Sequence, residues 1–364
     1  MNNLVIPVGE EGRTRALNEV LGKLLELGVV DAMMVPTMVT PGVITYLLAR
    51  DPEFARSKAE PFAPVMPVNG ASFVAKVVSK KPKGKVCALL KPCEVRALTE
   101  LVKLKQAEAD NLLVIGIDCL GTVARGEYEK AYPDVDRLSV REACKVCLNP
   151  DPPDTAFAGI NIGYIGLDDG RCLLASLSPD LDDRIRGVIE ELGFEKGDGL
   201  ADQRQAALAV LKEERGNSYE EFLRKTHAEQ DDGGVCGIAK LLAACVGCRN
   251  CRVACPVCYC RECIFDGDVF EYETRQLLER AEKKGGLKIP GETLLYHLTR
   301  MNHMSLSCVA CGMCEEACPV DIRLFPLFAR IARRTQGIME YTPGRSPEDP
   351  LPFTTFREDE LEPR

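Results

Sequence analysis

The sequence of 364 residues predicts an α/β N-terminal domain with a mainly parallel sheet, followed by a helical C-terminal module rich in cysteine. The first prediction rests on apolar runs of strand length that alternate with amphipathic segments up to about residue 175. The second rests on the cysteines, because the chain has 18 of them and most follow residue 235. A chain of this length is expected to form two domains, with room for a small third module.

The first elements are short and clearly bounded. Residues 4–8 are predicted to form a strand, and residues 13–27 an amphipathic helix that ends at Gly28. A further helix is expected to begin at Thr40, with Pro41 tolerated in its first turn.

A strand–helix–strand unit follows. The apolar runs 85–90 and 112–117 are typical of buried strands, and residues 94–105 between them have helical periodicity, which predicts two parallel neighbouring strands. Cys93 follows the first strand and Cys119 the second, so both are expected at the carboxyl edge of the sheet, where open α/β folds build their sites. Cys93 also precedes a helix N-terminus, which favours its thiolate.

The rest of the chain is mostly helical by pattern. Residues 182–230 are predicted to be helical, residues 231–234 to form a hinge, and residues 271–283 and 292–302 to form two further helices. The tail after Gln336 is rich in proline and acidic residues and is predicted to be an extended arm. The expected parts are an N-terminal domain over 1–175, a helical extension and hinge over 176–234, a cysteine-rich module over 235–335 and a tail over 336–364.

Composition excludes several classes of protein. The formal net charge of −9 argues against a nucleic-acid partner, because phosphate binding needs a basic face. No apolar run is long enough to span a bilayer, and the first residues lack the basic and apolar regions of a secretory signal. We therefore expect a cytoplasmic protein, in which 18 cysteines are metal or cluster ligands rather than disulfides.

Two cysteine runs in the C-terminal module have the spacing C-x2-C-x2-C-x3-C-P, one over residues 245–256 and one over 308–319. In such runs the first three thiolates hold one 4Fe–4S cluster and the fourth binds the other cluster. One cluster is thus assigned to Cys245, Cys248, Cys251 and Cys318, and the second to Cys308, Cys311, Cys314 and Cys255. Zinc knuckles would explain neither the third cysteine nor the proline. The module is predicted to be a dicluster ferredoxin-like (α+β) unit.

The other cysteines leave alternatives open. Cys144 and Cys147 form a C-x2-C pair that, with Cys93 and Cys119, provides ligands for a third 4Fe–4S cluster, although spacing alone equally allows four unrelated thiols. Cys87 and Cys172 are interpreted as small buried hydrophobic residues, and His227, His297 and His303 as core or surface residues. Four further cysteines either hold a fourth cluster or metal or lie beside the first two clusters: Cys236, Cys258, Cys260 and Cys263.

Three segments resemble one known family. Residues 91–98 (Lys-Pro-Cys-Glu-Val-Arg-Ala-Leu), residues 117–121 (Ile-Asp-Cys-Leu-Gly) and the pair Cys144-Lys-Val-Cys147 resemble beta subunits of coenzyme F420-reducing hydrogenases and of related formate dehydrogenases. More loosely, residues 41–45 and 69–72 look like two small-residue loops that contact flavin in that family. The resemblance covers about residues 35–175.

The resemblance implies a 4Fe–4S cluster at Cys93, Cys119, Cys144 and Cys147, beside an FAD that exchanges a hydride with a deazaflavin or other acceptor. It also implies the following flavin contacts: Pro41, Gly42, Asn69, Gly70, Ala71 and Lys91. The cofactors expected are therefore three 4Fe–4S clusters and FAD. The C-terminal position of the ferredoxin module and the extension over 258–263 depart from the hydrogenase pattern, which puts the identity of the hydride partner in doubt.

These features predict an iron–sulfur flavoprotein subunit of an anaerobic oxidoreductase complex, of the formate dehydrogenase or hydrogenase beta-subunit type. No residue of this chain is assigned a catalytic role, because the formate or hydrogen site is expected on a catalytic alpha subunit. An alternative is a flavin-free electron wire that links a catalytic subunit to a heterodisulfide-reductase-like or sulfite-reductase-like partner. A third alternative is a zinc-stabilised assembly scaffold, which would be colourless.

Overall fold

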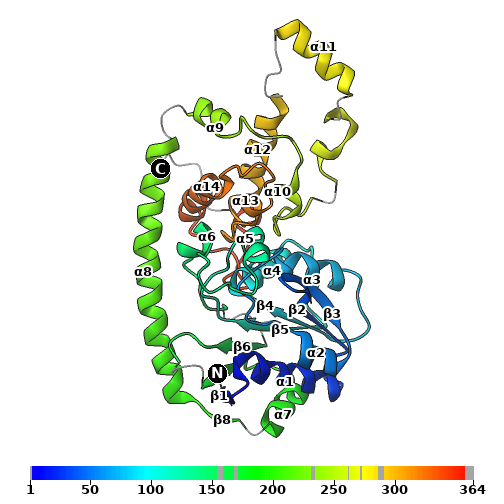
Figure 1. Cartoon of the computed structure of the whole chain (residues 1–364), viewed down its shortest axis with the longest axis vertical. Coiled ribbons are helices and arrows are strands. Elements are labelled where there is room, and N and C mark those ends of the chain that lie inside the picture. Colours follow the sequence, from blue (N-terminus) through cyan, green and yellow to red (C-terminus); the bar gives the residue numbers. More distant parts are fainter. Residues whose placement is uncertain are drawn as a thin grey trace.

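The computed structural model describes residues 2–153, 159–167, 171–192, 194–230, 234–260, 262–270, 273–285 and 291–356. A sheet domain and a cysteine-rich helical module are stacked on each other, and one long helix runs along the side of both (Figure 1). Most of the predicted hinge, residues 231–233, falls outside the described residues. In the described part of the chain, no helix has the length and apolar character needed to cross a membrane.

One sheet of eight strands, in the order β3-β2-β4-β5-β6-β7-β1-β8, organises the N-terminal domain. The α/β class is confirmed, but the sheet is mixed. Strands β2, β4, β5 and β6 pair in parallel, whereas the four outer pairings are antiparallel. The strand bounds are β1 (Asn2–Pro7), β2 (Ala32–Thr40), β3 (Val43–Ala49), β4 (Val86–Leu90), β5 (Leu112–Ile117), β6 (Ile160–Gly163), β7 (Cys172–Leu177) and β8 (Glu195–Lys196).

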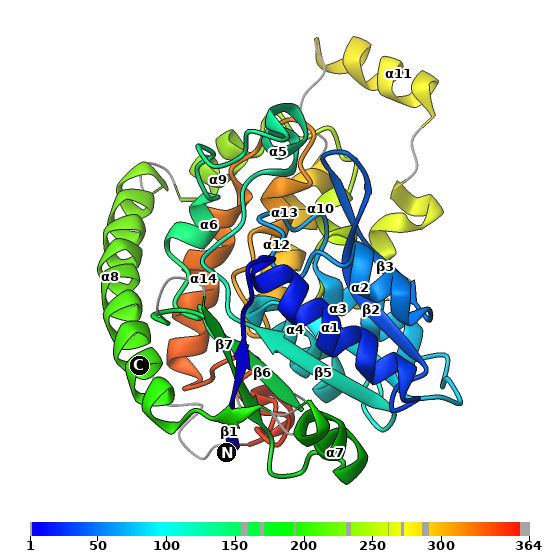
Figure 2. The same ribbon diagram turned by 60° about the horizontal axis from the view of Figure 1, so that its bottom comes forward.

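Helices cover both faces of the sheet, which explains why its central strands are continuously apolar. Along β4, Cys87 and Leu89 face one core, while Val86, Ala88 and Leu90 face the other. Packed on the first face are α1 (Gly12–Glu26), α2 (Pro52–Lys58) and α7 (Asp183–Glu191), as Figure 2 shows for α1. Packed on the second are α3 (Gly70–Val78) and α4 (Pro92–Lys103). The predicted strand–helix–strand unit is therefore confirmed.

The helix predicted from Thr40 is wrong, because residues 32–49 form the β2–β3 hairpin. Thr40 pairs with Val43, so Pro41 and Gly42 make a two-residue turn, and Gly42 has a φ of +78°. Proline fixes the first turn position and glycine tolerates a positive φ at the second. The β-branched residues that follow the turn favour a strand.

The C-terminal module is helical, and its described part contains no strand. The helices expected over 271–283 and 292–302 are present. The bounds are α9 (Val235–Leu241), α10 (Asn250–Val253), α11 (Thr274–Lys284), α12 (Gly291–Met304), α13 (Met313–Glu316) and α14 (Leu324–Ile338), with 3-10 turns η2 (Ile264–Asp266), η3 (Asp268–Phe270) and η4 (Pro352–Thr354). Apolar residues of α12 and α14 share one core with those of α3 and α4, so the module packs directly on the sheet domain.

Helix α8 (Asp198–Gln230) connects the two parts as one unbroken helix of 33 residues. It passes two short helices of the intervening loops, α5 (Arg125–Ala131) and α6 (Glu142–Lys145). Near its start Arg204 pairs with Asp118 at the end of β5, at 2.5 Å from Nη2 to Oδ1. In its C-terminal half Phe222 stacks on Phe325 of α14. The helix therefore fixes the module relative to the sheet.

The tail beyond α14 is not a free arm. The Tyr341 hydroxyl donates to the Glu100 carboxylate at 2.6 Å, and the Gly344 N–H donates to the same carboxylate at 2.8 Å. Nε of Arg96 donates to the Pro343 carbonyl at 3.0 Å, and Leu351 is buried. The tail thus crosses α4, because its apolar and polar groups find partners there that the proline-rich and acidic composition did not reveal.

Candidate metal centres

The structure brings the four N-terminal cysteines to one place. Cys93 lies in the first turn of α4, directly after β4, and Cys119 follows β5, so both are at the carboxyl edge of the sheet, as predicted. The loop that carries α6 returns Cys144 and Cys147 to this edge. All four thiols line one small cavity, together with Met66 of the sheet domain.

Burial controls the ionisation of these thiols. It raises the pKa of Cys119 to about 11 and holds the pKa of Cys93 well above its usual range, where Glu94 and neighbouring thiols add to the effect. Burial and the Glu94 carboxylate thus oppose the Cys93 thiolate, against the direction expected for a helix N-terminus. Lys91, nearly buried in the wall of the same cavity, acts in the opposite direction on the Cys119 pKa. Thiolates here need a bound cation, and metal binding would release their protons.

Polar hydrogens point at the sulfur of Cys144. The Thr122 N–H donates to Sγ at 3.3 Å, and Nη2 of Arg141 lies 3.8 Å from it. Gly121, with a φ of +127°, brings the chain so close that a Cβ would meet the Cys144 Cβ at 3.1 Å. Such N–H groups are the donors that tune cluster potentials in iron–sulfur proteins.

The two C-terminal runs adopt the same backbone. In the first run Gly247 and Arg249 have positive φ values of 68° and 59°, and in the second Ala310 and Gly312 have 56° and 70°. Three-cysteine loops of matching shape are thus followed by the short helices α10 and α13, which pack against each other. Two non-glycine residues held in the left-handed region indicate that the loops are shaped for function rather than for local stability.

The thiols that raise one another's pKa fall into two sets. Each set contains the first three cysteines of one run and the fourth cysteine of the other run. Besides burial, which is the largest cause, the thiols that raise the pKa of Cys245 are Cys251, Cys248 and Cys318. Those that raise the pKa of Cys314 are Cys255, Cys308 and Cys311. The fourth cysteine of each run is therefore an electrostatic neighbour of the first three of the other run.

The three sets lie in sequence through the molecule. Cys311 also lines the cavity of the N-terminal cysteines and raises the pKa of Cys93, so the N-terminal set adjoins the set around Cys308. The set around Cys245 lies beyond it and includes Cys248, whose side chain is exposed. Electrons entering at one end could therefore pass through all three sets to the surface.

Several other cysteines and one histidine lie outside the three cysteine sets. Cys87 is fully buried in β4, as predicted, whereas Cys236 is exposed on α9. Cys258 lies beside Cys255 and Arg300. His297 is 1% exposed, with Nε2 at 3.6 Å from Sγ of Cys245, and burial lowers its pKa to about 4. Among the described residues, no three His, Cys, Asp or Glu side chains converge as the ligands of a single metal ion do.

The predicted flavin contacts do not form a cradle. Gly42 packs against Tyr132, whereas a Cβ on Gly70 would lie 2.8 Å from the Tyr46 ring. The Gly70 N–H donates to the Glu94 carboxylate at 2.7 Å, and the Ala71 N–H donates to Oδ1 of Asn69 at 3.1 Å, so neither is free to meet a pyrophosphate. Pro41 is exposed in the hairpin turn, and Lys91 faces the cysteine cavity.

Two side chains around the centres, Arg141 and Arg96, were not among the predicted site residues. Asn69, predicted to contact flavin, is 0% exposed and lies beside Cys311. Burial raises the pKa of Cys311 to about 11, and the hydrogen bond with the Asn69 side chain opposes this rise. Arg141 lies against Cys144, and Arg96 lines a second cavity described below. Arg96 follows Cys93 by three residues on α4, so helical spacing was the available signal for it.

Comparison with known proteins adds the family context. The F420-dependent formate dehydrogenase subunit beta of Methanocaldococcus jannaschii is 26% identical over 319 residues, which are 76% of this chain and 78% of the relative. This chain is similar to formate dehydrogenase beta subunits. The F420-dependent formate dehydrogenase 1 subunit beta of Methanococcus maripaludis is also 26% identical, over 309 residues that are 73% of this chain and 74% of that relative. The predicted resemblance is confirmed.

Two further matches complete the comparison. Residues 241–322 match the family described as a 4Fe-4S dicluster domain, which supports iron–sulfur binding by the C-terminal module. A chain of the F420-reducing NiFe hydrogenase complex from Methanosarcina barkeri is 13% identical, with a TM-score of 0.46 over 64% of this chain and 93% of that chain.

Proposed function

We propose that this chain is an iron–sulfur electron-transfer subunit of an oxidoreductase complex, of the formate dehydrogenase or hydrogenase beta-subunit type. The observation that carries the proposal is the succession of three neighbouring cysteine sets, which begins at the sheet edge and ends at the exposed Cys248. The similarity to formate dehydrogenase beta subunits supports it.

Each set would hold one 4Fe–4S cluster, and the donors fit this group. Soft, clustered sulfur with backbone N–H groups directed at it is the ligand environment of such clusters. A bound cluster supplies one-electron transfer. The ligands proposed are Cys93, Cys119, Cys144 and Cys147 for the first cluster, Cys255, Cys308, Cys311 and Cys314 for the second, and Cys245, Cys248, Cys251 and Cys318 for the third.

The chain's own residues set the environment of the proposed clusters. Apolar residues of α3, α4, α12 and α14 exclude water from the interface between sheet domain and module. Thr122 and Arg141 direct N–H groups at Cys144, and the N–H of Ile322 donates to Sγ of Cys318 at 3.4 Å. These contacts would favour the electron-rich form of each sulfur.

The flavin part of the proposal comes from the family resemblance. It holds that FAD takes electrons from the first cluster and exchanges a hydride with a deazaflavin or similar acceptor. The residues expected to bind FAD do not fit it, because their N–H groups and the space at Gly70 are already occupied. We therefore derive no step through a flavin.

The occupied flavin loops favour a second candidate, the flavin-free electron wire. In that role the chain would pass single electrons between a catalytic subunit and a heterodisulfide-reductase-like or sulfite-reductase-like partner. Both candidates place the chain in a hetero-oligomeric, cytoplasmic and anaerobic complex, with formate or hydrogen chemistry on a catalytic alpha subunit. The relatives, which are named as beta subunits, support that arrangement.

Iron and flavin content test the proposal directly. Anaerobically purified chain should contain about 12 iron atoms, four for each of three clusters. Four or fewer irons would contradict three clusters, and about 16 would indicate a further cluster at Cys236, Cys258, Cys260 and Cys263. Stoichiometric FAD released on denaturation would support the flavoprotein, whereas full iron without flavin would support the wire.

A further inference from the structure

Arg96 is a buried cation on α4. Arg96 is 7% exposed and follows Cys93, a residue of the first cysteine set, by one turn of the helix. Nε donates to the Pro343 carbonyl at 3.0 Å. In the described part of the chain, Arg96 forms no ion pair with a carboxylate within 4.0 Å. A buried guanidinium without such a partner needs another source of negative charge, because burial disfavours the charged form.

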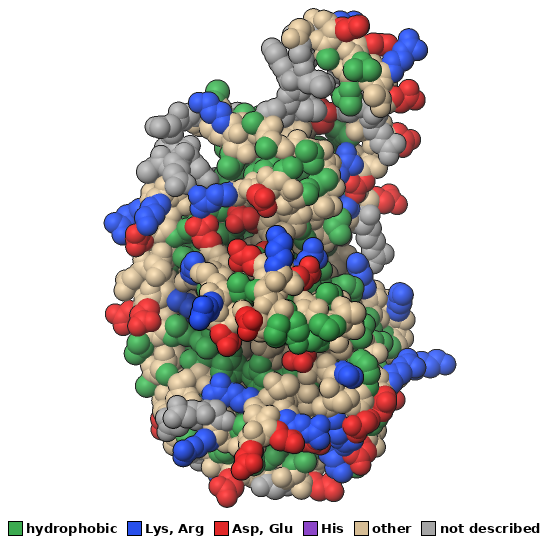
Figure 3. All heavy atoms as spheres, in the orientation of Figure 1, with side chains coloured by type: hydrophobic (Ala, Val, Ile, Leu, Met, Phe, Trp, Pro, Cys, Tyr) green, Lys and Arg blue, Asp and Glu red, His purple; other side chains and the backbone are tan. Residues whose placement is uncertain are grey.

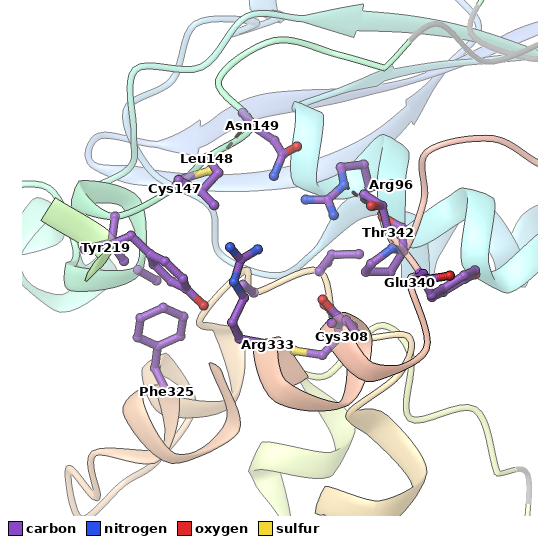
Figure 4. A pocket seen from close by; sticks show the side chains of 18 residues that line it. Arg96, Cys147, Leu148, Asn149, Tyr219, Cys308, Phe325, Arg333, Glu340 and Thr342 are labelled. Carbon is purple, nitrogen blue, oxygen red and sulfur yellow. Dashed lines mark hydrogen bonds between the residues drawn. The ribbon is translucent and has the colours of Figure 1, made fainter. Parts of the chain in front are cut away.

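Arg96 projects into a cavity of about 420 Å³ that lies between two of the cysteine sets. Cys147 of the first set lines one side of the cavity and Cys308 of the second set lines another, and the Arg96 guanidinium enters the same cavity from α4 (Figure 4). The Arg333 side chain lies between the two cysteines in this view. Arg333 and Glu340 also line the cavity, but both are exposed. Arg96 is thus the buried charge at the junction of the two sets.

The Glu100 carboxylate, one turn along α4, is engaged through one oxygen. Its Oε1 accepts hydrogen bonds from the Tyr341 hydroxyl, the Gly344 N–H and, at 3.3 Å, Nζ of Lys103, whereas its Oε2 makes no hydrogen bond to any described residue. Burial lowers the pKa of Arg96, and the groups that favour its charged form are, in order, Cys147, Cys93, Glu100 and Cys308. Cysteines of both sets are therefore counter-charges of this guanidinium, together with Glu100.

The C-terminal tail fixes the position of Arg96. Besides the bond from Nε to Pro343, Gly344 lies so close that a Cβ there would meet the Cα and Cβ of Arg96 at 2.4 Å. Gly344 also has a φ of +71°, which suits glycine. The tail therefore clamps Arg96 from the side opposite the sheet.

We propose that Arg96, clamped by the Pro343–Gly344 segment between the two cysteine sets, is a positioning charge that raises the reduction potentials of the clusters in both sets. The proposal rests on the proposed function, since it requires clusters at Cys93 and Cys308. Reduction adds an electron to a cluster, and a nearby positive charge in a poorly solvated cavity stabilises that added charge. One residue would thereby keep the two neighbouring centres matched for electron transfer.

Redox titration of the iron-loaded protein, followed by EPR, tests the proposal with Arg96→Gln and Arg96→Lys. Arg96→Gln should lower the midpoint potentials of the clusters at Cys93 and Cys308 and leave the cluster at Cys245 unchanged. Arg96→Lys should restore most of the shift, because it keeps a positive charge. Arg333→Gln is the matched control, since it removes an exposed arginine from the same cavity and should shift both potentials less than Arg96→Gln does, because solvent screens its charge. Cys93→Ser and Cys245→Ser assign the signals.

The possible results separate clearly. Unchanged potentials in Arg96→Gln at full iron content would overturn the proposal, and so would an equal shift of all three clusters or of the Arg333→Gln control. Iron loss in both Arg96 variants would also overturn it, because the role of Arg96 would then be structural. Iron loss in Arg96→Gln that Arg96→Lys repairs would support it. A wild-type protein without cluster signals would instead contradict the proposed function itself.

Discussion

At the scale of single residues, the cysteines span the full range of exposure, and their reactivity should follow it. Cys87 is 0% exposed and burial raises its pKa far above the usual range, so almost no thiolate is present at pH 8.5. Cys236 is exposed on α9. We predict that iodoacetamide at pH 8.5 labels Cys236 in the native, iron-loaded protein and leaves Cys87 unlabelled, as measured by mass spectrometry of peptides.

Unfolding in the presence of the reagent provides the control, because it should make Cys87 reactive. A native protein in which Cys236 is protected would contradict the prediction and would indicate that Cys236 is a ligand. The experiment therefore also tests whether Cys236, Cys258, Cys260 and Cys263 hold a fourth cluster or metal or only lie beside the first two clusters.

At the scale of elements, α8 is fixed to the sheet by two ion pairs of different burial. Arg204 pairs with Asp118, whose side chain is fully buried, whereas Lys212 pairs with Asp151, whose side chain is partly exposed. Replacing Arg204 would leave a buried carboxylate without its cation, a change that costs about 3 kcal/mol or more. We predict that Arg204→Met lowers the unfolding midpoint in urea markedly, as followed by circular dichroism under anaerobic conditions.

Lys212→Met is the matched control on the same helix. Because its partner remains in contact with solvent, the free energy of unfolding should fall by less than about 1 kcal/mol. Equal midpoints for the two variants would show that the Arg204–Asp118 pair does not contribute as a buried pair. A loss of iron in Arg204→Met alone would extend its effect to the neighbouring Cys119.

Most helices and strands could be predicted from the sequence, and the exceptions have physical causes. Strands β4 and β5 and helix α4 follow from apolar runs and helical periodicity, since both faces of the sheet are covered. The β2–β3 hairpin was mistaken for a helix because Pro41 suits both a first helical turn and a reverse turn. The helical pattern over residues 182–230 corresponds to α7 and to the single helix α8, which contacts β1 and α14.

At the scale of the whole molecule, the two C-terminal runs exchange one cysteine each. Cys314 and Cys318 are four residues apart in the same run but lie in different sets. We predict that Cys318→Ser damages the cluster of Cys245, Cys248 and Cys251, while Cys314→Ser damages the cluster of the other set. EPR and iron analysis of both variants, compared with wild type, provide the measurement.

Each variant should lose up to about four irons, the content of one cluster. If both variants altered the same EPR signal, the crossed assignment would be wrong. The cluster of the N-terminal cysteines should persist in Cys318→Ser, because the Cys245 set lies beyond the Cys308 set.

The cysteine sets could be proposed from the sequence because ligand spacing carries that information locally. It did not predict how the sets lie relative to each other, since the packing of the module on α3 and α4 depends on residues far apart in the chain. It also did not reveal Arg96, whose importance arises from Pro343 and Gly344 on the tail. The surface gives little guidance of its own, because acidic and basic side chains alternate over the face shown in Figure 3.

The return of the tail to α4 has a consequence for the order of biosynthesis. Arg96 and Pro343 are 247 positions apart, so a ribosome completes the sheet domain long before the clamp can form. Until then the cavity between the first two cysteine sets lacks the wall that Tyr341 and Pro343 provide. Docking of the last segment therefore completes this wall only after the cysteines of both sets have been synthesised.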